Sequence, residues 1–105
     1  MKIAIASQGE TKTSLIDPRF GRCSFFQIVD INNPEEIEVV ANPGKDSQRG
    51  AGVAAAQVLT NYDVDKVFAG DFGPNALQAL ESAGIEHVSI SNKSVSQLIK
   101  EYKNG

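Results

Sequence analysis

The segment Asp65-Lys-Val-Phe-Ala-Gly-Asp-Phe-Gly-Pro74 decides the fold of this chain of 105 residues. Its first half is a short apolar run that predicts a buried strand, and its second half predicts a turn into a helix with Pro74 in the first turn. The helix is expected over residues 75–82, because Gly84 is a typical residue after a helix end. Residues 85–90 then predict a second strand, which makes a strand–helix–strand unit with a right-handed parallel crossover.

The rest of the chain adds three strands and two helices around this unit. Two of the strands are separated by a short turn and predict an antiparallel hairpin. The sum is one α/β domain over residues 1–105, whose mixed sheet has the first strand and the last two strands as its parallel centre. The additional strands are expected over residues 2–6, 24–30 and 36–41, and the additional helices from residue 51 and from Ser94 to about residue 102.

Composition and charge exclude several classes of protein. The net charge of −3, with 10 Lys and Arg against 13 Asp and Glu, does not suit a nucleic-acid-binding protein, which normally carries a basic patch. No apolar stretch approaches the roughly 20 residues of a membrane span, and the first apolar run is too short for a signal peptide. The single cysteine, Cys23, cannot form an internal disulfide, so nothing indicates secretion. We expect a cytoplasmic protein.

The segment Asp17-Pro-Arg-Phe-Gly-Arg-Cys23 joins a polar loop to a strand and carries two arginines, a turn glycine and the only cysteine. Guanidinium groups suit carboxylate and phosphate recognition, and they also favour a neighbouring thiolate, which is a soft metal ligand. The segment therefore predicts anion binding, metal ligation through Cys23, or simple packing at the entrance of a strand, where free cysteines are often buried. A salt bridge from one arginine to Asp17 or Asp30 is a further structural alternative.

Gly70 and Gly73 lie between a predicted strand end and a predicted helix start, where free backbone N–H groups form an anion site. The same glycines also suit a tight turn and close packing. Neither a Walker loop nor a dinucleotide fingerprint is present. Ligands of such sheets bind beyond the carboxyl ends of the parallel strands. The segments expected at that edge are residues 7–23, 70–74 and 91–93, joined by the helix start near Arg49 and Gly50.

Catalytic sets are weakly represented. No serine has a histidine and an acid at the spacing of a known triad motif, and His87, inside a strand, is expected to be structural. Asp17, Asp30 and Asp71 are too scattered for the two-metal site of a nuclease. We therefore expect no catalytic residue and a non-enzymatic binding protein. A small enzyme acting on a phosphorylated or carboxylated metabolite is a remaining alternative.

Residues 17–23, with the following Phe25-Phe-Gln-Ile-Val-Asp30, resemble the first signature of the nitrogenase iron-molybdenum cofactor accessory family. Gly70-Asp-Phe-Gly-Pro-Asn-Ala76, Leu80 and Gly84-Ile85 are similar to its second signature. The resemblance covers nearly the whole chain and identifies it as a small stand-alone member. It implies a ribonuclease-H-like, three-layer α/β/α fold with a five-stranded mixed sheet. It also implies binding of iron-molybdenum cofactor or an iron-sulfur cluster precursor.

The same resemblance implies the residues that hold the cluster. Cys23 is the implied metal ligand; the residues implied to bind the anionic cofactor are Arg19, Gly21, Arg22, Gly70 and Gly73. One cysteine cannot hold a conventional four-thiolate cluster, so the site suits a preformed cluster or one shared across a dimer. The implied partners are proteins of cluster assembly, with no nucleic acid or membrane. Arg19 stands where several cofactor-binding members have a histidine, which favours the alternative of a regulatory or protein-interaction module that has lost the cluster.

Overall fold

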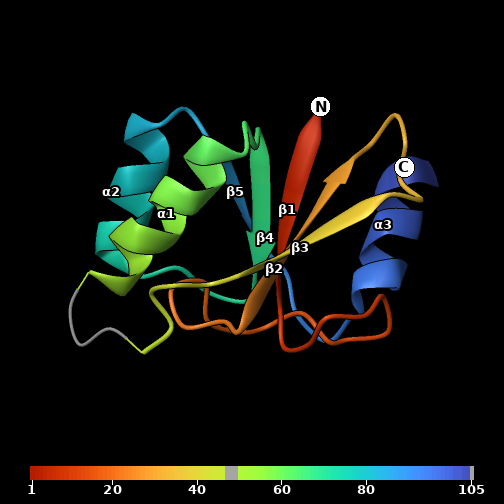
Figure 1. The fold of residues 1–105 in the computed structure, drawn as a ribbon, viewed down its shortest axis with the longest axis horizontal. Coiled ribbons are helices and arrows are strands. Elements are labelled where there is room, and N and C mark those ends of the chain that lie inside the picture. Colours follow the sequence, from red (N-terminus) through yellow and green to blue (C-terminus); the bar gives the residue numbers. More distant parts are fainter. Residues whose placement is uncertain (47–49, 105) are drawn as a thin grey trace.

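The computed structural model describes residues 1–46 and 50–104 as a five-stranded mixed sheet with helices on both faces (Figure 1). Every predicted strand and helix is present, with ends that differ by one or two residues from the prediction. No helix in the described ranges is long and apolar enough to cross a membrane. The elements are β1 (Lys2–Ser7), β2 (Phe25–Asp30), β3 (Ile37–Ala41), α1 (Ala51–Asn61), β4 (Lys66–Ala69), α2 (Pro74–Ser82), β5 (Glu86–Ser89) and α3 (Val95–Asn104).

The strand order is β3-β2-β1-β4-β5. Strand β2 is antiparallel to both β1 and β3, which confirms the predicted hairpin. Strand β1 is parallel to β4, and β4 is parallel to β5, which confirms the predicted parallel centre. In the register of this centre, Ile5 of β1 pairs with Phe68 of β4 on one side and with Gln27 of β2 on the other. The mixed sheet and the α/β class are therefore as expected.

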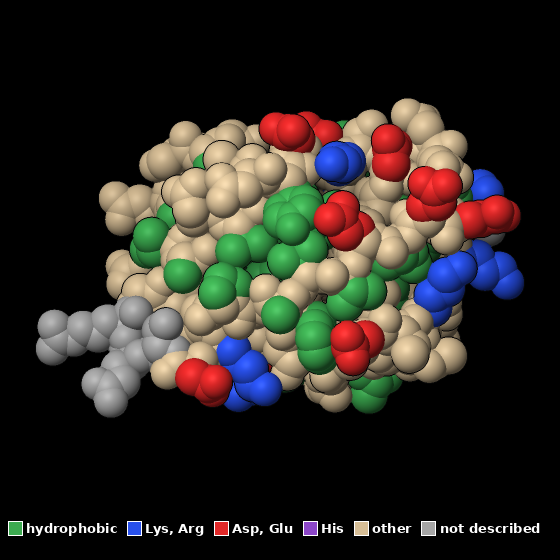
Figure 2. Space-filling model, viewed as in Figure 1, with side chains coloured by type: hydrophobic (Ala, Val, Ile, Leu, Met, Phe, Trp, Pro, Cys, Tyr) green, Lys and Arg blue, Asp and Glu red, His purple; other side chains and the backbone are tan. Residues whose placement is uncertain are grey.

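The central strand β1 is buried on both faces because helices cover both sides of the sheet (Figure 1). Ala4 and Ala6 point into the core under α1 and α2, whereas Ile3 and Ile5 point into the core under α3. Burying an isoleucine side chain stabilises the fold by about 1.5–3 kcal/mol. Figure 2 shows hydrophobic side chains across the middle of one face of the molecule, with acidic and basic side chains mostly around them.

Three loops meet at the edge formed by the carboxyl ends of the parallel strands. The Gly70 N–H donates a hydrogen bond to the Asp17 carbonyl (3.0 Å), and the Phe20 N–H donates to the Asp71 carbonyl (3.1 Å). A Cβ atom on Gly70 would lie 2.5 Å from the Pro18 Cα, so only glycine allows this approach. The loop after β1 is thus fixed to the end of β4, and this contact positions the site.

Candidate functional site

A cleft of about 610 Å³ opens at this edge of the sheet. Three segments form its walls: residues 18–22 of the loop after β1, residues 50–52 at the start of α1, and residues 71 and 73–76 at the start of α2. Figure 1 shows that α1 and α2 both begin at this edge. The cleft therefore combines a loop rich in arginine with the amino-terminal ends of two helices.

Within the described residues, the N-cap residue of neither helix caps it with a side chain. The N-cap residue of α1 is Gly50, with a left-handed backbone (φ 70°), and the N-cap residue of α2 is Gly73, with an extended backbone. The first N–H groups of a helix have no partner within the helix, and they carry a partial positive charge. At both helix starts these groups lie at the wall of the cleft, where an anion can accept hydrogen bonds from them.

Arg19 lies in the cleft wall and is held at its base by Asp17. Its Nε lies 3.4 Å from Asp17 Oδ1, and its backbone N–H donates to the same oxygen (2.9 Å). The salt bridge that we weighed as a structural alternative is therefore present. However, the Arg19 side chain is 65% exposed while that of Asp17 is 3% exposed. The guanidinium group thus remains accessible to a ligand while the buried carboxylate orients it.

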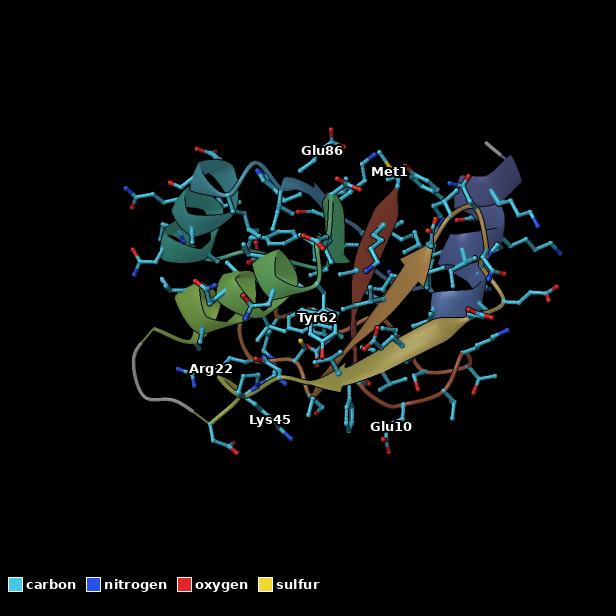
Figure 3. All side chains as sticks on the ribbon, turned by 45° about the horizontal axis from the view of Figure 1, so that its top comes forward. Met1, Glu10, Arg22, Lys45, Tyr62 and Glu86 are labelled. Carbon is cyan, nitrogen blue, oxygen red and sulfur yellow. The ribbon has the colours of Figure 1, made fainter. Side chains whose placement is uncertain are left out.

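Arg22 lines the same cleft and contacts the loop that precedes α1. Its Nη1 donates to the Lys45 carbonyl (3.2 Å), and in Figure 3 both labelled residues lie below α1 on the same side of the molecule. Gly21 lies against the first turn of α1, where an added Cβ would be 3.0 Å from the Gly52 nitrogen. Glycine at this position therefore lets the arginine loop lie directly against the helix terminus.

Phe20 anchors the loop in the core. The side chain is 1% exposed, and its ring packs against the rings of Phe26 and Phe72 at centroid distances of 5.5 and 5.2 Å. Because this aromatic anchor is fixed in the core, Arg19 and Arg22 on either side of it are held at the cleft.

Asn42 is a structural determinant of the cleft that our sequence reasoning missed. Its buried amide donates to the carbonyls of Gly21 and Cys23 (both 3.0 Å), and its Oδ1 accepts from the Gly44 N–H (3.0 Å). The residue thereby joins the arginine loop to the loop before α1. An asparagine before a proline signals a turn, but nothing local to it indicates a partner about 20 residues away.

Cys23 does not lie in the cleft wall. Its side chain is fully buried in the core beneath α1 and α2. Burial, and secondarily the charge of Asp17, raises the pKa of the Cys23 thiol from 9.0 to about 12. Our expectation that the neighbouring arginines would favour the thiolate is therefore wrong, since desolvation of the sulfur dominates and neither arginine is among the groups that lower the pKa. At neutral pH the group is a protonated thiol inside the protein.

The other residues weighed for a site divide between cleft and core. Gly73 lines the cleft with open space around its Cα, whereas Gly70 packs against Pro18 and is absent from the lining. His87 is half-buried beside the Phe72 ring, in agreement with a structural role. Arg49 lies outside the described residues.

Metal-ligating side chains are not gathered in the described ranges, where no group of three or more His, Cys, Asp or Glu residues could hold a metal ion. The donors at the cleft are guanidinium and backbone N–H groups. This donor set fits an anion that is held by charge and hydrogen bonds, rather than a metal ion held by several protein ligands.

Comparison with known proteins finds relatives that match nearly the whole chain. The family model described as dinitrogenase iron-molybdenum cofactor matches residues 1–105. The apo form of the orange protein from Desulfovibrio gigas is 35% identical, with a TM-score of 0.92 over 99% of this chain and 88% of that one. A Thermotoga protein provisionally named NifB is 30% identical, with a TM-score of 0.85 over 99% and 88% of the two chains.

An uncharacterised protein of Methanocaldococcus jannaschii is 29% identical over 107 residues, which cover 100% of this chain and 87% of the relative. The match of the family model to the whole chain agrees with the two signatures that begin at Asp17 and Gly70, and it confirms the resemblance. The chain belongs to the dinitrogenase iron-molybdenum cofactor family.

Proposed function

We propose that the protein is a non-enzymatic carrier that binds an anionic metallocluster, of the iron-molybdenum cofactor or iron-sulfur precursor type, as its cargo. Membership of the family supports the class of cargo. The observation that carries the proposal is the convergence of Arg19, Arg22 and two uncapped helix termini on one cleft. Each of these features favours negative charge.

Binding in this proposal uses the outer atoms of a preformed cluster. The first-turn N–H groups of α1 and α2 donate hydrogen bonds to the cargo, and the two arginines offset its charge. Gly21 and Gly73 act by keeping the backbone open to the cargo. Cys23 contributes to the core behind the cleft, and Gly70 fixes the loop, so neither is a ligand in the proposed complex.

Two finer assignments belong to the same proposal. The ribonuclease-H-like label is supported by the order β3-β2-β1-β4-β5, in which β2 is antiparallel to both neighbours. A role in cluster assembly would place the protein in the cytoplasm, with proteins that donate or receive the cluster as its partners.

Anaerobic titration with isolated iron-molybdenum cofactor, followed by visible absorption after gel filtration, tests the proposal. We expect the wild type to retain the chromophore and the Arg19→Gln, Arg22→Gln double variant to bind at least about tenfold more weakly. The Lys12→Gln, Lys100→Gln variant removes the same charge away from the cleft and should bind like wild type. Cys23→Ser should also bind, because its side chain lies outside the cleft.

Failure of the wild type to retain either the cofactor or an iron-sulfur precursor would overturn the carrier proposal. If a metal-free protein partner then co-purified in stable stoichiometry, the alternative of a regulatory or protein-interaction module would be supported. Full binding by the double arginine variant would show that the cargo binds elsewhere.

A further inference from the structure

Asp71 is an acidic residue in a cleft that otherwise favours anions. Among the described residues of the lining it is the only carboxylate, and it shares the wall with Arg19, Arg22 and the first turns of α1 and α2. Its side chain is exposed. None of the ion pairs in the described part of the chain includes it. Within the described residues, this negative charge has no cationic partner, and it lies where the proposed function puts an anionic cargo.

The local structure does not require this charge. The Asp71 carbonyl accepts a hydrogen bond from the Phe20 N–H (3.1 Å), and any residue supplies that group. Its Oδ1 accepts from the Phe72 N–H (2.9 Å), and an asparagine side chain also provides an oxygen there. The carboxylate is thus replaceable by a neutral amide of the same shape, so its charge can be tested separately from its contacts.

We propose that Asp71 determines the charge specificity and the release of the cargo. This inference rests on the proposed function of the cleft. Arg19, Arg22 and the helix termini attract the anion, and the Asp71 carboxylate repels it at short range. The repulsion increases in proportion to the charge of the ligand, so it weakens the binding of a dianion more than that of a monoanion of the same shape.

The repulsion makes it easier for a carrier to release its cargo. Differences in affinity between variants of one site arise mainly in the dissociation rate. A like charge at the wall therefore shortens the time that the cargo stays bound, while the arginines remain in the wall to attract the next anion. Asp71 makes binding reversible without removing any donor from the cleft.

Perrhenate, with one negative charge, and molybdate, with two, are tetrahedral oxyanions. Their affinities test directly whether the repulsion by Asp71 depends on the charge of the ligand. Tetrathiomolybdate, a coloured dianion that contains molybdenum and sulfur, tests release by stopped-flow absorption. The proteins are the wild type, Asp71→Asn, and Glu81→Gln as a control for net charge, because Glu81 is exposed at the far end of α2. Asp71→Ser is a second variant without the charge, and thermal unfolding verifies that each protein is folded.

For Asp71→Asn we expect the Kd for each dianion to fall about three- to tenfold, mostly through slower dissociation of tetrathiomolybdate. The gain for perrhenate should be about half as large on a logarithmic scale. Both gains should shrink as ionic strength rises. The Glu81→Gln control should leave all three affinities unchanged.

Equal or weaker binding of the dianions by both Asp71 variants would overturn the inference, and so would an equal gain in Glu81→Gln. If the wild type binds and the variants show no gain, the inference fails while the proposed function stands. Binding only by the Asp71 variants would support the inference in its strongest form. If no protein binds any of the three anions, the inference fails, and the proposed function is decided separately by the cofactor titration.

Discussion

Three helices begin at the same edge of the sheet, and their first turns are built in two different ways. At α3, the Ser94 Oγ accepts from the Gln97 N–H and the Gln97 side chain accepts from the Ser94 N–H, which is a reciprocal capping box. The N–H groups of the two residues between Ser94 and Gln97 donate to the carbonyls of Ser14 and Lys12. By contrast, α1 and α2 each have a glycine as the N-cap residue, which has no side chain to cap the helix.

The difference separates a structural joint from the proposed binding surface. At α3 the donors are consumed by the loop that packs there, so nothing remains for a ligand. At α1 and α2 the donors lie in the wall of a cleft with Arg19 and Arg22. A glycine N-cap costs only about 0.3 kcal/mol relative to a good cap, and a chain with two such helix starts around one cleft has donors available for an anion.

The largest effect is expected where the arginine loop meets the end of β4, beneath the uncapped helices. In Gly70→Ala the new Cβ would lie 2.5 Å from the Pro18 Cα, so the loop must move. We expect a loss of about 2–3 kcal/mol in the free energy of unfolding, measured with urea. Gly73→Ala is the matched control, because Gly73 has open space around it and a negative φ. Equal losses in the two variants would contradict this explanation.

The buried thiol behind the cleft predicts a loss of stability at alkaline pH. The pKa of Cys23 is about 12 in the folded protein and near its ordinary 9.0 when unfolded, so only the unfolded state loses the proton between these values. The stability is intact below pH 9 and falls as pH rises toward 12, by about 1.4 kcal/mol at pH 10. Urea unfolding of wild type and Cys23→Ala across this range measures it. Parallel curves for the two proteins would contradict it.

Removing the cap of α3 tests the helix whose first N–H groups are already paired within the protein. Ser94→Ala deletes the acceptor of the Gln97 N–H, and we expect it to destabilise the protein by about 1 kcal/mol. Anion binding at the cleft should not change, because this helix start lies outside the lining. Thermal unfolding and a molybdate titration of the same variant measure the two effects. A change in molybdate affinity would mean that the two sides are coupled.

Closing one of the uncapped helices gives the smallest change in stability. Gly73 has the extended backbone of an N-cap residue (φ −69°, ψ 161°), so Gly73→Asp can cap α2 and should stabilise it by about 0.3 kcal/mol. Molybdate affinity should fall severalfold, because the donors are occupied and a charge is added. Gly73→Asn adds the cap without the charge and should lose less affinity. Unchanged affinity in both variants would show that this helix start does not bind the anion.

The fold was predictable because its signals are local. A proline at the start of α2 and a glycine after its end delimit the helix, and the short apolar runs on either side can only be buried strands. Alternation of strand and helix then requires parallel pairing, and that pairing brings the loops to one edge. Arg19, Gly21, Arg22 and Gly73 were accordingly chosen from the sequence and lie at the cleft.

The features that were not predictable depend on contacts between distant segments. Cys23 follows Arg22 by one residue, yet one side chain enters the core and the other the cleft wall, because the direction of each depends on the register of the loop. The role of Gly70 depends on Pro18 lying across it, and that of Asn42 on carbonyls about 20 residues earlier. No periodicity in the sequence encodes such approaches.

The contacts of Gly52 have a consequence for the dimensions of the cleft. An added Cβ there would lie 2.7 Å from the Ala76 Cβ, and a Cβ on Gly21 would lie 3.0 Å from the Gly52 nitrogen. The arginine loop, the start of α1 and the start of α2 therefore pack against one another at one point, and a shift of one segment requires a shift of the others. The width of the cleft is therefore fixed before a ligand binds, and the cleft can select ligands by size without an induced closure. Little reorganisation opposes the binding of a ligand that fits.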